Sequence, residues 1–316
     1  MEARPSGRAQ TFMQRLRAGD DIAYLITFVC AVSIVLITAL LVYELYINSA
    51  AARAQFGWRF LTSSTWDPVA GNFGALPFIY GTVVTSALAL IIGIPLGVGS
   101  AIFLAELAPP RISSALTFLI ELLAAVPSVI FGVLGIFILV PVLRHLEDPL
   151  RAALGWTPLF QGPFYGVSLL SGGVVLSVMI IPFIISISRE VILAVPGDQR
   201  EAALALGATR WETTWDVVVP FARKGIAGSI FLALARSLGE TMAVTMVVGN
   251  DPKIHASLFA PGYSIAAVIA NEFTEATGDI YPSALILLGL VLFALTIIIN
   301  GAARLLVAST GDKGNS

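Results

Sequence analysis

Along the chain, long uncharged runs of apolar residues alternate with shorter polar segments. A helix needs about 20 consecutive, predominantly apolar residues to cross the hydrocarbon core of a bilayer. Six runs are long enough, and each is predicted to be helical because hydrocarbon offers no partner to unsatisfied backbone groups. The predicted spans cover residues 21–47, 77–106, 112–143, 166–193, 223–250 and 281–305.

The composition supports this pattern. The chain is 57% hydrophobic and 12% charged, whereas soluble domains contain about 25% charged residues. We therefore predict an all-α integral membrane protein with six transmembrane helices. A single cysteine excludes a disulfide within the chain, and the two histidines lack ligand-like spacing, so no metal or cofactor is expected. The net charge of −2 does not indicate a nucleic-acid partner.

The distribution of positive charge predicts the orientation. Cytoplasmic connections of membrane proteins are enriched in Lys and Arg. Of the eighteen Lys and Arg, twelve fall on one side of the six spans and five on the other, while Arg236 lies within a span. We therefore expect cytoplasmic segments at 1–20 and 306–316, an extracytoplasmic segment at 48–76, and a location in the cytoplasmic (inner) membrane.

The first predicted span has two features of a secretory signal peptide. Arg15 and Arg17 precede the apolar run, and an Ala-Arg-Ala sequence follows at 52–54. A signal peptide has an apolar region of about 7–15 residues, with cleavage close to its end. Because the run is longer and the Ala-Arg-Ala sequence lies well beyond it, we interpret the run as a retained transmembrane helix.

The fourth connection, residues 196–220, is predicted to form two short amphipathic helices on the cytoplasmic side. Asp198 is expected to cap the first helix, and Gly207 is expected to terminate it. Thr209, with a glutamate three residues later, has the spacing of a capping box that begins the second helix. Pro220 is expected to end that helix.

Two tryptophans are expected on one face of the second short helix. Trp211 and Trp215 are four residues apart, which places them one turn apart on a helix surface. Amphipathic helices with tryptophan on the apolar face can lie flat on a membrane. Composition alone therefore allows an interfacial helix pair in contact with membrane lipid.

The spacing within this connection resembles the EAA loop of ABC importer permeases. The matching positions are Glu201, Ala202, Ala203, Gly207, Val217, Val219 and Pro220. The resemblance implies an ABC importer type-1 permease fold over a core of about 77–305. It also implies that the loop docks on a separate ATPase subunit and transmits its closure, with Trp211 and Trp215 anchoring the loop.

ATP hydrolysis is expected to belong to a partner subunit, and the chain is not predicted to be an enzyme. A P-loop requires a Gly-Lys dipeptide, and the chain contains none. The sequence Leu-Ser-Gly-Gly at 170–173 resembles part of an ABC ATPase signature, but it begins an apolar span. We interpret Gly172 and Gly173 as small residues for helix packing. The spans also lack metal-ligand clusters and Ser-His or Cys-His pairs.

Arg236 and Glu240 are the only ionisable residues between Lys224 and Asp251. Arg236 lies about 12 residues into its span, roughly 18 Å along a helix, where an arginine costs at least about 2.5–3.5 kcal/mol on insertion scales. One interpretation is a structural ion pair. The other is that Arg236 offers a permanently charged guanidinium to a passing oxyanion, while Glu240 holds its orientation.

Three hydroxyl residues complete the predicted substrate pathway. Ser237 and Thr241 share the fifth predicted span with the charged pair. Ser128 follows Pro127, which breaks the third span near its middle. The backbone groups freed by that break must lie against protein or a water-filled cavity, so the break fits a pathway, although a packing kink fits equally.

The segment "ARSLGETMAVTMVVGN" resembles the fifth span of phosphate-specific ABC permeases, with Ser237 in place of the usual alanine. The segments at 121–135 and 73–82 resemble other parts of the same family, and its C-type subunit fits best. The resemblance implies that Arg236 and Glu240 move phosphate. It also implies three kinds of partner: an A-type second permease subunit, a dimer of ATP-binding subunits and an extracytoplasmic phosphate-binding protein.

Two other functions stay open at this point. A permease for sulfate or molybdate would share the cytoplasmic loop and the buried arginine. An ion-coupled secondary carrier could use Glu240 as its proton site, but it would not need a loop that docks on an ATPase.

Overall fold

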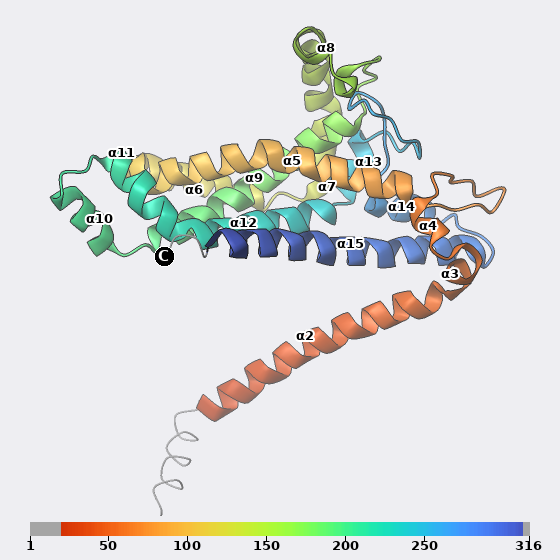
Figure 1. Cartoon of the computed structure of the whole chain (residues 1–316), viewed down its shortest axis with the longest axis horizontal. Helices are drawn as coiled ribbons and strands as arrows, with labels where there is room; N and C mark the ends of the chain where they lie inside the picture. The colour runs from red at the N-terminus through yellow and green to blue at the C-terminus, as the bar shows by residue number, and fades with distance from the viewer. Residues whose placement is uncertain (1–19, 312–316) are drawn as a thin grey trace, which may run out of the picture.

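The computed structural model describes residues 20–311 (Figure 1), so residues 1–19 and 312–316 of the two predicted cytoplasmic segments lie outside the described residues. Regular structure in the described part is helical, apart from two isolated β-bridges. Six helical segments are long and apolar enough to cross a membrane. They are Ile22–Asn48, Leu76–Leu107, Ser128–Leu154, Leu169–Leu193, Arg210–Leu238 and Ile280–Leu305.

Helix α9 (Leu169–Leu193) forms the centre of the bundle and packs along α5 (Leu76–Ile102). In α9, 67% of the most apolar window is buried, against at most 33% in the other spans. Small residues allow the close approach: a Cβ atom on Gly173 would lie 2.6 Å from Leu88 Cβ. Gly173 therefore packs α9 against α5, in agreement with its interpretation as a packing residue.

The third predicted span is divided into two parts. Helix α6 (Pro110–Ala124) ends before Pro127, and α7 (Ser128–Leu134) begins directly after it. A proline lacks the backbone donor and disfavours the helical conformation in the residue before it, which explains the break. The membrane-length helix begins at Ser128 and continues through η2 (Gly135–Leu139) and α8 (Val140–Leu154). The expectation of one span at 112–143 was therefore wrong in its extent.

The fifth predicted span is also interrupted, and it begins earlier than expected. A continuous helix runs through α11 (Arg210–Glu212), the π-helical turn η4 (Thr213–Val218) and α12 (Val219–Leu238). Residues 239–241 then break the helix before α13 (Met242–Val247).

Pro220 does not end the second helix of the connection at 196–220, contrary to expectation. It lies in the first turn of α12, directly after η4. In a π-helical turn the hydrogen bonds are already out of α-helical register. The helix therefore continues although Pro220 has no N–H to donate, and what was expected to be a separate short helix is the beginning of the fifth span.

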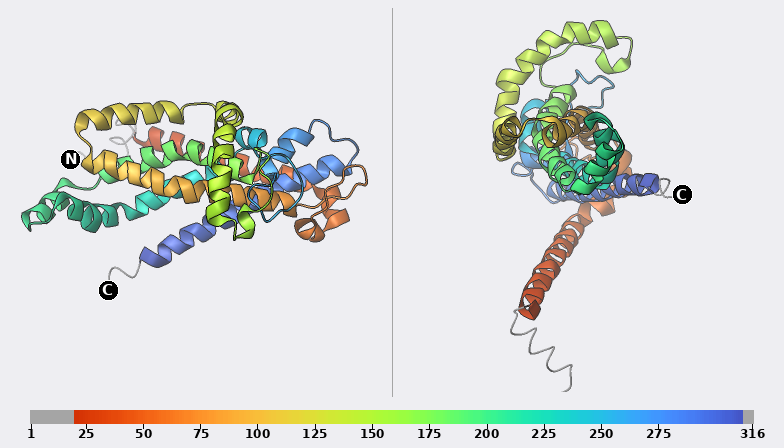
Figure 2. Two further views of the ribbon diagram at one scale, coloured as in Figure 1. Left: turned by 90° about the horizontal axis from the view of Figure 1, so that it is seen from above. Right: turned by 90° about the vertical axis from the view of Figure 1, so that its left-hand side faces the viewer.

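The first helix, α2 (Asp20–Asn48), diverges from the bundle (Figures 1 and 2). None of its apolar window is buried. It is held at its C-terminal end, where Ser283 on α15 (Ile280–Gly311) donates to Asn48 O at 3.0 Å. Ser283 Oγ also accepts from Ala52 N at 3.1 Å, which fixes α3 (Ala50–Phe56) to the same helix.

The connections at the α3 end of the bundle form a packed cover. Trp66 donates to Glu272 Oε2 at 2.8 Å, and Tyr281 donates to the same oxygen at 2.6 Å. The Trp66 ring also lies edge-on against two phenylalanine rings, at 4.7 and 4.8 Å between centroids. The short helices here are α4 (Arg59–Thr62) and α14 (Ile265–Glu272), whereas η3 (Pro158–Phe160) packs against α8.

Candidate functional site

Arg236 and Glu240 lie on the two sides of the helix break rather than on one continuous helix. Arg236 is in the last turn of α12, and Glu240 is within the break that follows Leu238. Their side chains do not form an ion pair: Glu240 Oε1 accepts from Ala243 N at 3.2 Å, near the beginning of α13. Because the helix ends first, the one-turn spacing expected from the sequence is lost.

The side chain next to the Arg236 guanidinium is an aromatic ring and not Glu240, contrary to expectation. The Arg236 guanidinium carbon lies 4.1 Å from the centre of the Phe183 ring on α9. At this distance the cation is attracted to the negative face of the ring. Arg236 Nε is buried and has no hydrogen-bond partner among the described residues. The arginine is therefore oriented by α9, and its charge is not neutralised by a carboxylate within residues 20–311.

The predicted hydroxyl residues differ in what they face. Ser237 is buried, and its hydroxyl donates to Leu234 O at 2.9 Å, so it is turned into the bundle. Thr241 lies in the break and donates weakly to Gly239 O at 3.4 Å. Ser128 is half-buried at the beginning of α7.

The breaks in the third and fifth spans lie at one level of the bundle. A Cβ atom on Gly132 of α7 would lie 3.2 Å from Ala243 Cα, and one on Gly135 would lie 2.8 Å from Val247 Cγ1. From Gly132 to Gly135, the contacted residue also moves forward in the sequence, from Ala243 to Val247. Helices α7 and α13 therefore pack in parallel. Ser128 and Glu240, which lie just before these contacts in the two segments, are therefore at the same end of the helix pair.

The connection at 196–220, which the sequence predicts to be cytoplasmic, begins with α10 (Gly197–Ala205). Asp198 is within the first turn and Pro196 occupies the N-cap position, so the expectation that Asp198 caps this helix was wrong. Gly207 terminates the helix as predicted, with a φ of +90°. Its N–H bonds to Leu204 O at 3.0 Å, and the next N–H bonds to Ala203 O at 3.2 Å, which is the Schellman arrangement.

The second helical segment of the connection, α11, begins after Thr209 as predicted. Thr209 Oγ1 accepts from Glu212 N at 3.3 Å, and Glu212 Oε2 accepts from Thr209 N at 2.8 Å, which confirms the capping box. The rings of Trp211 and Trp215 lie 5.5 Å apart, so the two side chains share one face.

This connection exposes apolar side chains at the end of the bundle. Leu206 is 90% exposed, Trp211 57% and Trp215 44%. Glu201 and Ala202 are also exposed, whereas Ala203 is half-buried and Pro220 is exposed on α12. Contiguous exposed apolar groups with a polar surround are typical of protein or membrane contact surfaces.

Sequence reasoning missed an ion pair at the base of the same connection. Arg200 on α10 bonds to Glu106 in the π-helical turn η1 (Phe103–Leu107), with Nη2–Oε1 at 2.7 Å. The two residues are 94 positions apart, and no spacing rule connects them. The presence of two charges at the ends of apolar segments was the only available signal.

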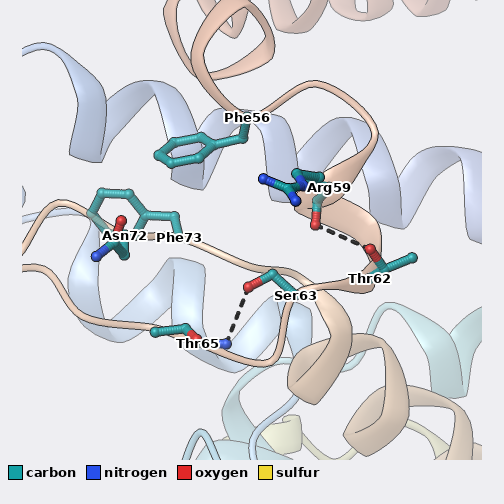
Figure 3. Close-up of a pocket in the computed structure, with 7 residues that line it drawn as sticks. All are labelled: Phe56, Arg59, Thr62, Ser63, Thr65, Asn72 and Phe73. Carbon is teal, nitrogen blue, oxygen red and sulfur yellow. Dashed lines mark hydrogen bonds between the residues drawn. The ribbon is translucent and has the colours of Figure 1, made fainter.

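A separate pocket of about 380 Å³ lies beside α4 (Figure 3), and α4 is at the opposite end of the bundle from α10 (Figure 1). Its cation is Arg59, which is exposed. The pocket is built from residues 56–73 and not from α12, so it is distinct from the Arg236 site. Its lining residues are Phe56, Arg59, Thr62, Ser63, Thr65, Asn72 and Phe73.

Comparison with known proteins identifies the family. Residues 93–311 match the family described as "Binding-protein-dependent transport system inner membrane component". The chain is similar to proteins named "Phosphate transport system permease protein PstC". The one from Mesorhizobium japonicum is 45% identical over 96% of this chain and 95% of the relative. The one from Xylella fastidiosa is 47% identical over 81% of each chain, and that from Pasteurella multocida 44% over 90% of each.

A solved structure supports the fold. The chain resembles an inward-facing conformation of the MetNI methionine ABC transporter, with a TM-score of 0.52 and 17% identity over 73% of this chain and 94% of that one. This similarity confirms the predicted ABC importer permease architecture. Together with the family match, it shows that the chain is a multi-pass membrane protein of the family of binding-protein-dependent transport system inner membrane components.

Proposed function

We propose that this chain is a permease subunit that moves inorganic phosphate inward across the cytoplasmic membrane. The observation that carries the proposal is the Arg236 guanidinium, held at a break in a membrane helix without a carboxylate partner among the described residues. A guanidinium matches the geometry of phosphate oxygens better than an ammonium. The printed names of the relatives support phosphate as the substrate.

The helix breaks support a translocation pathway at this level. Breaks in membrane helices free backbone groups, which are tolerated where they lie against protein or line a cavity. Here Ser128 and Thr241 stand at two breaks that share one level with Glu240. We infer that phosphate passes Arg236 beside these residues. Ser237, which faces the bundle, supports the helix packing instead.

The exposed connection at 196–220 supports the proposal that a separate subunit supplies the energy for transport. The apolar surface of Leu206, Trp211 and Trp215 offers an anchor for a separate ATP-binding subunit. ATP would draw two such subunits together, and the connection would follow. The chain itself contains no Gly-Lys dipeptide and so no P-loop. In this proposal a second permease subunit completes the pathway, and a phosphate-binding protein delivers the ion to the extracytoplasmic end.

The proposed orientation places both termini in the cytoplasm. It rests on the excess of Lys and Arg on that side of the six spans. The connection that contains α10 is then cytoplasmic, where ATP is available. The cover around Trp66 and the pocket around Arg59 are then extracytoplasmic, on the side from which a binding protein would approach.

The test is phosphate uptake by the assembled complex with Arg236→Gln and Arg236→Lys. We expect loss of import with glutamine and partial import with lysine, which keeps the charge but not the planar donor fork. Uptake of sulfate, with a sulfate-binding protein supplied, measures selectivity in parallel. Full phosphate import by Arg236→Gln would contradict the proposal, and import of sulfate in preference to phosphate would assign the chain to a different oxyanion.

A further inference from the structure

Arg200 joins the exposed connection to the ends of two core helices. Its Nη2 bonds to Glu106 Oε1 at 2.7 Å, and its Nε lies 3.1 and 3.3 Å from the two carboxylate oxygens. Its side chain is 22% exposed and that of Glu106 12%. This is a two-point contact between a guanidinium and a carboxylate, which fixes orientation as well as distance.

The same guanidinium also binds the C-terminal end of α9. Nη2 donates to Ile192 O at 2.8 Å, and Nη1 donates to Val195 O. The last carbonyl groups of a helix lack partners within the helix and carry partial negative charge. Arg200 bonds to one carbonyl in the last turn of α9 and to one just beyond its end, and it therefore ties α10, η1 and α9 together at one point.

The π-helical turn η1, which carries Glu106, is also bonded to α6. In η1 the Ala108 N–H bonds to Phe103 O, five residues back. The Leu104 carbonyl accepts from the buried Ser113 hydroxyl of α6 at 2.7 Å. A displacement of Glu106 would therefore move the end of α5 and the beginning of α6 with it.

We propose that the Arg200–Glu106 contact is a clamp that transmits movement of the exposed connection to α5 and α9. This inference rests on the proposed function, in which an ATP-binding subunit moves that connection. Helix α9 also carries Phe183, against which Arg236 is held. The clamp thus joins the surface that meets the ATPase to a helix that positions the substrate arginine.

Breaking only the ion pair tests the clamp in the complete transporter complex. Glu106→Gln keeps the shape of the side chain, and Arg200 retains its carbonyl contacts. We expect the variant to co-purify with the ATP-binding subunit as wild type does and to continue hydrolysing ATP. Phosphate import per assembled complex should fall about tenfold, within the usual range of coupling between sites. Glu106→Asp, which keeps the charge, should restore most of the import.

Arg111→Gln is the control for removing a charge without breaking an ion pair. Arg111 is an exposed arginine at the beginning of α6 and has no ion pair within residues 20–311. Import at the wild-type rate per complex by Glu106→Gln would overturn the clamp, whether or not assembly falls, because the contact would then be structural only. Absence of phosphate import by the wild-type complex would instead refute the proposed function.

A distance measurement tests the clamp independently of import. Spin labels at Gln199 and Leu107, in a Cys30→Ser background, report the separation of α10 from η1. A clamp predicts the same separation with and without ATP. A shift of the distance beyond the width of its distribution would show that α10 moves relative to α5, and the clamp would be wrong.

Discussion

Phe183 is expected to control import because it holds Arg236 in position. Replacing it with leucine removes the contact of 4.1 Å between the guanidinium carbon and the ring centre. Cation–π contacts contribute about 0.5–1 kcal/mol when exposed and about 2 kcal/mol when desolvated. Because Arg236 is half-buried, we expect a loss of about 1–2 kcal/mol in the preference for this orientation. At about 1.4 kcal/mol per tenfold, import would fall roughly 5- to 30-fold.

The assay is the initial rate of phosphate uptake per assembled complex. Phe183→Tyr keeps an aromatic ring and should retain most of the rate. Phe137→Leu makes the same substitution on a ring that is 74% exposed, and it should have no effect on import. A wild-type rate for Phe183→Leu, with normal assembly, would refute the reasoning. The orientation of Arg236 by α9 would then have no bearing on import.

Three further outcomes follow from backbone geometry and packing. Gly207→Ala places a Cβ where φ is +90°, which should destabilise this turn by about 1–2 kcal/mol. The amount of co-purified ATP-binding subunit should therefore fall, and an unchanged amount would contradict this prediction. Thr209→Ala removes the cap and should destabilise the turn by about 1 kcal/mol, seen as faster amide exchange there. Gly173→Val would collide with Leu88 and lower the melting temperature, whereas Gly99→Val, which has open space around its Cβ position, should not lower it.

Local rules predicted local features of the exposed connection correctly. The termination at Gly207 and the capping box at Thr209 depend on residues within one or two turns, so the sequence is sufficient to locate them. The same rules failed for Asp198 and Pro220. In both cases the position depended on where the helix began or on the π-helical turn before it, and neither is visible in a short motif.

The apolar runs by themselves determined that the chain crosses a membrane with helices, because a bilayer accepts no other arrangement of these residues. The charged residues within and beside those runs showed where function should be sought. Only the tertiary structure decided their partners. Arg236 meets Phe183 instead of Glu240, and Arg200 meets Glu106 across 94 positions. Helix ends and helix packing set these contacts, and both depend on neighbours that are distant in the sequence.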